Sequence, residues 1–229
     1  MRRLEVQELG RTGYAEALAW QENLAARRKR GEIADQLLLL EHPPVVTLGR
    51  NAHEENVLLS PELLRSKGIE LHETNRGGDV TFHGPGQVVG YPIIDLREWK
   101  RDVVAYVRAV EQVIIEALGQ FGIQGERDPG ATGVWVNGAK VCAIGVHISR
   151  WVTTHGFALN WTTDLNYFQY IVPCGLTRPV TSLERLGIRV ERAAVHAAIT
   201  GGFARVFDYE PVPVVETGAP NALLAAGRL

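Results

Sequence analysis

The spacing of hydrophobic positions changes several times along the chain, and each change marks an expected element. Apolar or alternating runs are typical of strands, whereas spacings of three and four indicate helices. Strands are expected at residues 4–9, 37–40, 45–48, 79–83, 88–94, 134–136, 139–146 and 152–160. Helices are expected at residues 14–30, 61–68, 103–121 and 191–207.

The strongest turn signal is Asn137-Gly138, which lies between two of the expected strands. These two residue types tolerate the positive φ angles that a two-residue hairpin turn requires. His83-Gly84-Pro85-Gly86 is expected to form a second, rigid turn between two further strands. Hairpin signals therefore dominate the middle of the chain.

The expected helix at residues 103–121 has the clearest periodicity. Asp102 is expected to cap its first turn. We interpret its apolar stripe as part of the hydrophobic core. The members of that stripe are Val103, Val107, Val110, Ile114, Ala117 and Phe121.

Strands and helices do not alternate in a regular rhythm. This order favours an α+β architecture, in which helices pack on a mixed or mostly antiparallel sheet. A length of 229 residues suits one domain, and no break in composition marks a second. We expect a single domain over residues 1–210 and a C-terminal tail or extension over residues 211–229.

The composition argues against several classes of protein. The 24 Lys and Arg residues and the 26 Asp and Glu residues give a net charge of −2, which does not suit a nucleic-acid-binding protein. No apolar segment is long enough to span a membrane, and the N-terminus lacks the apolar run of a signal peptide. The cytoplasm is therefore the expected compartment. Two cysteines without a histidine cluster indicate neither a disulfide framework nor a zinc site.

The two cysteines, Cys142 and Cys174, have different surroundings. Cys174 lies between a proline and a glycine, which indicates a shaped loop that a substrate can approach closely. Cys174 is thus a candidate nucleophile, although a buried and unreactive thiol would fit the same position. Cys142 lies inside an apolar strand, and we interpret it as a packing residue.

Lys140 begins the strand that contains Cys142, just after the Asn-Gly turn. It is either an exposed hairpin lysine or a cation directed inward. An inward cation would favour the thiolate of a nearby cysteine, and a desolvated lysine could also act as a base. Spacing alone cannot bring residues 140 and 174 together.

Two further segments contain candidate binding residues. Arg76-Gly77-Gly78 precedes a strand, and its paired glycines permit close approach of the backbone to a ligand, although no phosphate-loop pattern is present. His83 is a pocket histidine, a general acid or base, or simply a hydrogen-bonded turn residue. The segment 155–160, which begins with His155-Gly156, has the same character.

Taken together, these segments resemble the lipoyl(octanoyl) transferase family, also called lipoate-protein ligase B. The resemblance extends from about residue 5 to about residue 205. Its two longest motifs exclude a chance match. The motifs are RGGDVTFHGPGQ (76–87), GYP (90–92), GVW (133–135), Lys140 with AIGV (143–146), HGFALN (155–160), IVPCG (171–175) and VTSL (180–183).

The resemblance implies the α+β fold of biotin and lipoate ligase catalytic domains. It implies an acyltransferase that moves an octanoyl group from acyl carrier protein to a lysine of a lipoyl domain, the first step of protein lipoylation. No cofactor and no metal are implied. The implied partners are octanoyl acyl carrier protein, the lipoyl domains of 2-oxoacid dehydrogenase E2 subunits and the glycine cleavage H protein, with no nucleic acid and no membrane.

The resemblance also implies the roles of particular residues. Cys174 corresponds to the nucleophile that carries the acyl group, and Lys140 to the residue that lowers its pKa. Cys142 departs from the family pattern, in which a small residue without a thiol is expected. The implied acyl-site residues are Arg76, Gly77, Gly78, Asp79, Val80, Thr81, Phe82, His83, Ala143, Ile144, Gly145, Gly156, Phe157 and Ala158.

Three alternative functions fit parts of the same sequence. An ATP-dependent lipoate or biotin ligase would form an acyl-adenylate and would not need Cys174. A cysteine hydrolase would release free fatty acid, and a non-catalytic acyl-binding module would bind acyl chains without Cys174.

A run of four cations, residues 27–30, ends the first expected helix. Cations suit the negative end of the helix dipole, so we interpret the run as a solvated helix end. Steering of an acidic carrier protein is the alternative role of this run.

Overall fold

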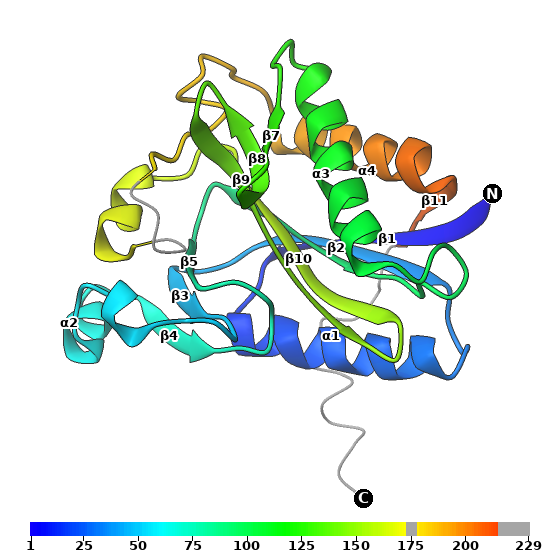
Figure 1. The fold of residues 1–229 in the computed structure, drawn as a ribbon, viewed down its shortest axis with the longest axis horizontal. Helices are drawn as coiled ribbons and strands as arrows, with labels where there is room; N and C mark the ends of the chain where they lie inside the picture. Colours follow the sequence, from blue (N-terminus) through cyan, green and yellow to red (C-terminus); the bar gives the residue numbers. More distant parts are fainter. Residues whose placement is uncertain (173–177, 215–229) are drawn as a thin grey trace, which may run out of the picture.

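The computed structural model describes residues 1–172 and 178–214, and within them two sheets carry the fold (Figure 1). The larger sheet has eight strands and the smaller has three. In spatial order the larger sheet contains β11 (Tyr209–Pro213), β1 (Arg2–Arg11), β2 (Asp35–Glu41), β6 (Gln87–Ile93), β10 (Val152–Asn160), β9 (Ala139–Ser149), β8 (Ala131–Val136) and β7 (Glu126–Asp128). The smaller contains β4 (Glu70–Glu73), β3 (Val45–Leu48) and β5 (Val80–His83).

Helices cover the larger sheet on both faces. α1 (Tyr14–Lys29) packs against β6 and β10 on one face, where it closes a small apolar cluster. α3 (Val103–Gly119) and α4 (Arg192–Phe207) pack against each other and close the main core on the opposite face (Figure 1). The shorter helices are α2 (Pro61–Ser66), η1 (Glu54–Asn56) and η2 (Leu165–Tyr170).

The expected α+β class is confirmed. In the larger sheet, β1 pairs in parallel with both β2 and β11. The remaining neighbours, in the spatial order β2, β6, β10, β9, β8 and β7, pair antiparallel, so the sheet is mixed. Asn137 and Gly138 have φ angles of 50° and 76° and connect β8 to β9 as a hairpin, as the sequence predicts. Asp102 caps α3 by accepting a hydrogen bond from the Ala105 backbone N–H.

The interpretation of the α3 stripe as core is wrong at its first two positions. Val103 is 45% exposed, Val107 is half-buried, and both lie at a cavity described below. Tyr106 and Val113, which the stripe did not include, are fully buried. Val103 and Val107 therefore face the cavity, whereas Tyr106, which lies between them in sequence, faces the core.

The basic run at the end of α1 is not a uniformly solvated surface. Arg28 is buried, and its guanidinium forms ion pairs with Asp35 at 2.8 Å and Glu98 at 2.7 Å. Lys29 is half-buried and Arg30 is exposed. The solvated interpretation is therefore wrong for Arg28, which joins α1 to the sheet.

Two other features were not evident from the sequence. β2 and β3 adjoin along the chain but belong to different sheets, so the turn between them passes from one sheet to the other. Residues 211–213, which we assigned to the C-terminal tail, belong to β11 and pair with β1. The division into one domain and a tail otherwise stays a prediction.

Candidate active site

A cavity of about 520 Å³ lies over the middle of the larger sheet, beneath the smaller sheet and the loop before β5. Its volume is typical of a site for a small ligand. Every residue that we predicted for substrate binding lines it, except Asp79 and Phe82. Its other walls include the polar residues Tyr14, Tyr91 and Asn160 and the apolar residues Val103 and Val107.

Small side chains on neighbouring strands leave the floor of the cavity open. Gly145 of β9 pairs with Gly156 of β10, and Ala143 pairs with Ala158 in the same way. Residues two apart on a strand share a face, so both pairs lie on the same side of the sheet. A Cβ at Gly156 would lie 2.2 Å from the carbonyl oxygen of Gly90, and therefore no larger residue fits there.

The loop with Arg76, Gly77 and Gly78 is fastened to both sheets. The Gly77 N–H donates to the carbonyl of Val146 on β9 at 2.9 Å. The buried guanidinium of Arg76 donates from Nη2 to the carbonyl of Thr47 on β3 at 2.7 Å. Gly78 has a φ of 87°, a conformation that favours glycine. The glycine pair therefore has a structural use at the wall of the cavity.

Asp79 and Phe82 lie outside the lining of the cavity, contrary to their predicted place there. Both are buried. The Asp79 carboxylate accepts hydrogen bonds from the His53 backbone and from the Asn56 side chain, at 3.2 and 2.6 Å. Phe82 stacks on Tyr167 of η2, with ring centroids 4.6 Å apart. Contacts with η1, with the residue before it and with η2 hold these two side chains, whereas their neighbours Val80 and Thr81 line the cavity.

Three buried histidines surround the polar wall of the cavity, and each has a defined tautomer. His83 donates from Nδ1 to Oε1 of Gln87 at 2.8 Å. His155 donates from Nε2 to Oδ1 of Asn75 at 2.7 Å. His42 donates from Nδ1 to the carbonyl of Thr12 and accepts at Nε2 from the Tyr91 hydroxyl, both at 2.7 Å. Of the roles considered for His83, the geometry gives it both a place at the cavity and a hydrogen bond in the turn.

Burial keeps these histidines neutral. It lowers the pKa of His42 to about 4, and the pKa values of His83 and His155 to about 3. The nearby Arg76 guanidinium lowers the pKa values of His83 and His155 further. At neutral pH none of the three carries a proton that it could donate as an imidazolium acid.

We expect the protein to lose stability steeply between pH 6 and pH 4. The histidines of the unfolded chain take up protons below about pH 6.5, whereas the folded chain excludes them until about pH 3 to 4. Each histidine then removes about 1.4 kcal/mol of stability per pH unit. Urea unfolding at pH 7.5, 6 and 5 measures this slope, and His42→Gln should make it shallower. A free energy of unfolding that stays constant from pH 7 to pH 5 would contradict the assignment.

Lys140 lines the cavity at the start of β9. Its Nζ lies 4.8 Å from the centre of the Trp135 ring, a cation–π geometry. Its stem passes over Gly133, where a Cβ would lie 3.4 Å from Lys140 Cε and 2.6 Å from the Cys142 carbonyl oxygen. Gly133 has a φ of 132°, so both space and conformation require glycine. Lys140 is thus directed to the cavity and not into open solvent.

The chain on either side of the Cys174 segment is held in place, although Cys174 itself lies outside the described residues. Before the segment, the Val172 N–H donates to the carbonyl of Asn56 at 2.7 Å. After it, Val180 forms a β-bridge with Lys140. The Lys140 N–H donates to the Pro179 carbonyl, and the Lys140 carbonyl accepts from the Thr181 N–H, both at 2.9 Å.

Cys142 is fully buried in the main core, and burial raises the pKa of its thiol. A bulge in the pairing of β8 with β9 lies between Lys140 and Cys142, so their equal parity along the strand does not give them a common environment. The interpretation of Cys142 as a packing residue is confirmed. An apolar thiol with a raised pKa has little thiolate at neutral pH.

Several residues of the site were not predicted from the sequence. Gln87 donates from Nε2 to Asn160 Oδ1 at 2.9 Å, and Asn160 donates to the Thr181 carbonyl at 3.0 Å. This chain of contacts connects His83 with the strand segment beside Lys140. Gln87, Tyr91 and Asn160 all lie inside the motifs that carry the family resemblance, and this position could have identified them as site residues. Tyr14, at the start of α1, lies outside these motifs, and no sequence signal marked it as a site residue.

Two absences apply to the described part of the chain. Residues 1–172 and 178–214 contain no group of three or more His, Cys, Asp or Glu residues arranged to hold a metal ion. None of the helices in the same two ranges has both the length and the apolar character needed to cross a membrane.

The fold and the cavity define an α+β catalytic domain of the lipoate ligase type. A lipoate-protein ligase A bound with ATP matches 98% of this chain and 93% of its own, with a TM-score of 0.78 and 18% identity. A bi-partite lipoate protein ligase from Thermoplasma acidophilum, whose structure was analysed together with its E2 lipoyl domain, matches 99% and 92%, with a TM-score of 0.79 and 15% identity. At these identities the matches define the fold alone.

Sequence similarity defines the family. Residues 13–204 match the lipoyl protein ligase A/B catalytic domain. An octanoyltransferase from Solibacter usitatus is 62% identical over 213 residues, which cover 93% of this chain and 97% of the relative. The chain therefore belongs to the lipoyl protein ligase A/B catalytic-domain family, among its octanoyltransferases.

Proposed function

We propose that the protein takes an octanoyl group from acyl carrier protein, holds it as a thioester on Cys174 and delivers it to a lysine of a lipoyl domain. Octanoyl transfer in protein lipoylation is the activity of its family, in which relatives of 45–62% identity are octanoyltransferases. The carrier protein as donor and the Cys174 thioester are the new parts. The observation that carries them is the backbone pairing of Lys140 with residues 179–181, just after the Cys174 segment.

In the first half-reaction, the Cys174 thiolate attacks the carbonyl carbon of the donor thioester. A new carbon–sulfur bond forms at Cys174, and the bond to the carrier's sulfur breaks. The carrier leaves as a thiolate, which takes up the proton that Cys174 released. One thioester replaces another, so this step is near thermoneutral.

In the second half-reaction, the neutral amine of the target lysine attacks the enzyme thioester. A carbon–nitrogen bond forms, the Cys174 sulfur leaves, and the amine loses one proton. The product is an amide, which is more stable than a thioester. No ATP is consumed, because the donor acyl group is already activated.

Lys140 has two proposed roles at Cys174. As a cation it favours the thiolate, and as a neutral amine it accepts the proton of the attacking lysine. The Trp135 ring beside Nζ and the close fit over Gly133 limit the positions that the ammonium group can adopt. Backbone N–H groups of the glycine loops are the candidate donors to the oxyanion.

The cavity is the proposed site of the alkyl chain. Its floor of Ala143, Gly145, Gly156 and Ala158 carries no polar side chain, and the apolar residues Ile144 and Phe157 also line it. Removing a CH₂ group from water contributes about 0.8 kcal/mol. Lipoyl domains of 2-oxoacid dehydrogenase E2 subunits and the glycine cleavage H protein are the proposed acceptors.

One assay without ATP tests this function. The protein is mixed with octanoyl acyl carrier protein and a lipoyl domain, and all species are analysed by mass spectrometry. We expect an octanoylated enzyme first and an octanoylated lipoyl domain afterwards. A requirement for ATP would indicate a ligase, and release of free octanoate a hydrolase. Bound octanoyl that never becomes covalent would indicate an acyl-binding module.

A further inference from the structure

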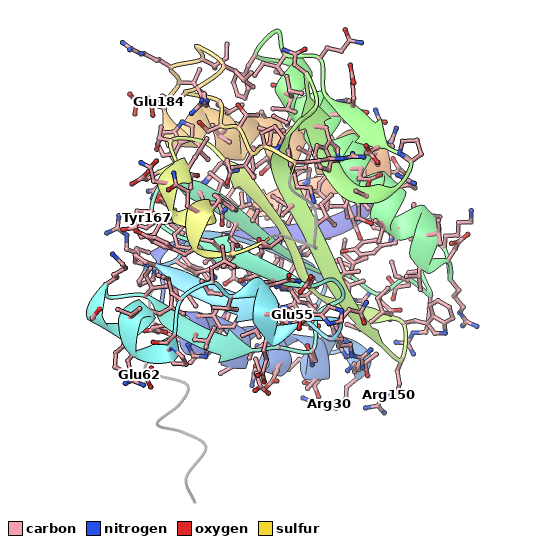
Figure 2. The ribbon with its side chains drawn as sticks, turned by 60° about the vertical axis from the view of Figure 1, so that its left-hand side comes forward. Arg30, Glu55, Glu62, Arg150, Tyr167 and Glu184 are labelled. Atoms are coloured by element: carbon pink, nitrogen blue, oxygen red, sulfur yellow. The ribbon has the colours of Figure 1, made fainter. Side chains whose placement is uncertain are left out.

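A second cavity, of about 470 Å³, lies between the C-terminal half of α1 and the tip of the β9–β10 hairpin. Four of its lining residues are basic: Lys29, Arg30, His147 and Arg150. Glu22 is the one carboxylate in that lining within the described residues. Figure 2 shows Arg30 and Arg150 side by side at the lower edge of the molecule. We call this cavity, with its four basic residues, the basic cleft.

Within the described residues, two of the four basic residues in the cleft, Lys29 and Arg150, lack an acidic partner, whereas Arg30 pairs with Glu32. Neither Lys29 nor Arg150 forms an ion pair with any carboxylate of residues 1–172 and 178–214. Burial and the Arg150 charge lower the pKa of Lys29, and burial with the Arg50 and Lys29 charges lowers the pKa of His147. Mutual repulsion of this kind is relieved when an anion binds.

The turn that presents Arg150 is strained. Ser149 pairs with Val152, so Arg150 and Trp151 form a two-residue hairpin turn, and their φ angles are 51° and 67°. Asn137-Gly138 makes the equivalent turn between β8 and β9 with residues suited to positive φ. Trp151 packs against the main core, which accounts for its presence. Arg150 is exposed and has no such contact, and strained positions cluster where a ligand is held.

The basic cleft adjoins the acyl cavity. Asn75 and His147 line the cleft, whereas their chain neighbours Arg76 and Val146 line the acyl cavity. The two walls are joined by the hydrogen bond from Gly77 N–H to the Val146 carbonyl and by that from His155 to Asn75. A macromolecule bound at the cleft would therefore hold its attached acyl group next to the acyl cavity.

We propose that the basic cleft docks the protein that donates the acyl group, through Asp and Glu side chains on the donor's surface. This inference rests on the proposed function and extends it to recognition of the donor. The acceptor is a poorer fit to the cleft, because its target lysine arrives as a cation that Lys29 and Arg150 repel. The donor brings no such charge with its acyl group.

The test compares two donors in the first half-reaction. One is octanoyl acyl carrier protein, and the other is the octanoyl thioester of N-acetylcysteamine, a small uncharged thiol. The variant Lys29→Glu/Arg150→Glu reverses two charges of the cleft. The matched control Arg185→Glu/Arg189→Glu reverses two exposed charges near Glu184, which lies at the opposite end of the view in Figure 2.

We expect the cleft variant to lower kcat/KM for the carrier-bound donor by about 10- to 100-fold at low salt, mainly through KM. The loss should shrink as ionic strength rises, because salt screens exposed charges. Acylation by the small thioester should change less than about twofold, and the control variant should match wild type with both donors. Arg150→Asn, which suits a positive φ, should reproduce a smaller loss without straining the turn.

Other results overturn the inference. Unchanged kinetics of the cleft variant with the carrier-bound donor would overturn it. An equal loss of activity with both donors would also overturn it, because such a loss indicates a disturbed fold. If the cleft variant only raised the KM for the acceptor in the second half-reaction, the cleft would bind the acceptor, and the proposal would be overturned. Wild-type protein that is acylated by neither donor would defeat the proposed function itself, and the docking role with it.

Discussion

Replacing Cys174 with alanine is expected to abolish both the acyl-enzyme and the transfer of octanoyl to a lipoyl domain. The mechanism needs a nucleophile that forms and then releases a thioester, and alanine has none. We expect activity to fall by at least 10³-fold. Intact-mass spectrometry after mixing with octanoyl acyl carrier protein should show no increase by one octanoyl group. Cys174→Ser should also fail to transfer at a useful rate, since an unactivated hydroxyl is a far weaker nucleophile than a thiolate.

Cys142 provides the matched control. It is the other cysteine of the chain, it is fully buried, and burial raises the pKa of its thiol. Cys142→Ala removes one sulfur from the core and should lower the free energy of unfolding by only about 1 kcal/mol. Transfer should stay within a few-fold of wild type. Equal losses of activity in the two single variants would remove the basis for assigning the nucleophile to Cys174.

Lys140→Ala is expected to have the second-largest effect, with transfer about 10²- to 10⁴-fold slower. A free cysteine has a pKa of about 8.5, so only a few per cent is thiolate at neutral pH. Without the cation, the pKa of Cys174 should return to that value. The rate of alkylation of Cys174 against pH reports this change directly.

Lys140→Arg separates the two roles of the lysine. Arginine keeps the positive charge but cannot release its proton at any useful pH. We therefore expect Lys140→Arg to retain the low alkylation pKa and to form acyl-enzyme, but to stall before the amide. Lys67→Ala is the control, since Lys67 also lies over an aromatic ring, 5.3 Å from the centre of Tyr170. A Lys140→Ala variant with an unchanged alkylation profile and normal acylation would show that the two residues do not act together.

Local chemistry made several features of the structure predictable. The Asn137-Gly138 hairpin, the Asp102 cap and the strands beside the cavity depend on residues close together in sequence. The φ preferences and hydrogen-bonding groups of these residues act over a few positions, so the local sequence pattern is enough to predict these features. The motifs likewise indicated most of the cavity lining, because several of them supply lining residues.

Longer-range features were not predictable in this way. Arg28 looked like one of four solvated cations, but it is buried because Asp35 and Glu98 approach it from other elements. Val103 and Val107 looked like core, but they line the acyl cavity. Asp79 and Phe82 belong to a site motif, yet their side chains contact Asn56 and Tyr167 and do not line the cavity.

The sequence by itself determined the α+β class, the family and the residue types available for acyl transfer. Only the tertiary structure decided which of these residues lie close together in space. Lys140 is brought to the segment after Cys174 by backbone hydrogen bonds between residues about forty positions apart, and no local preference encodes such pairing. The floor of the acyl cavity exists because the register of β9 and β10 places Gly145 beside Gly156 and Ala143 beside Ala158. Register is set by the packing of whole faces, which is a property of the folded sheet and not of any one strand.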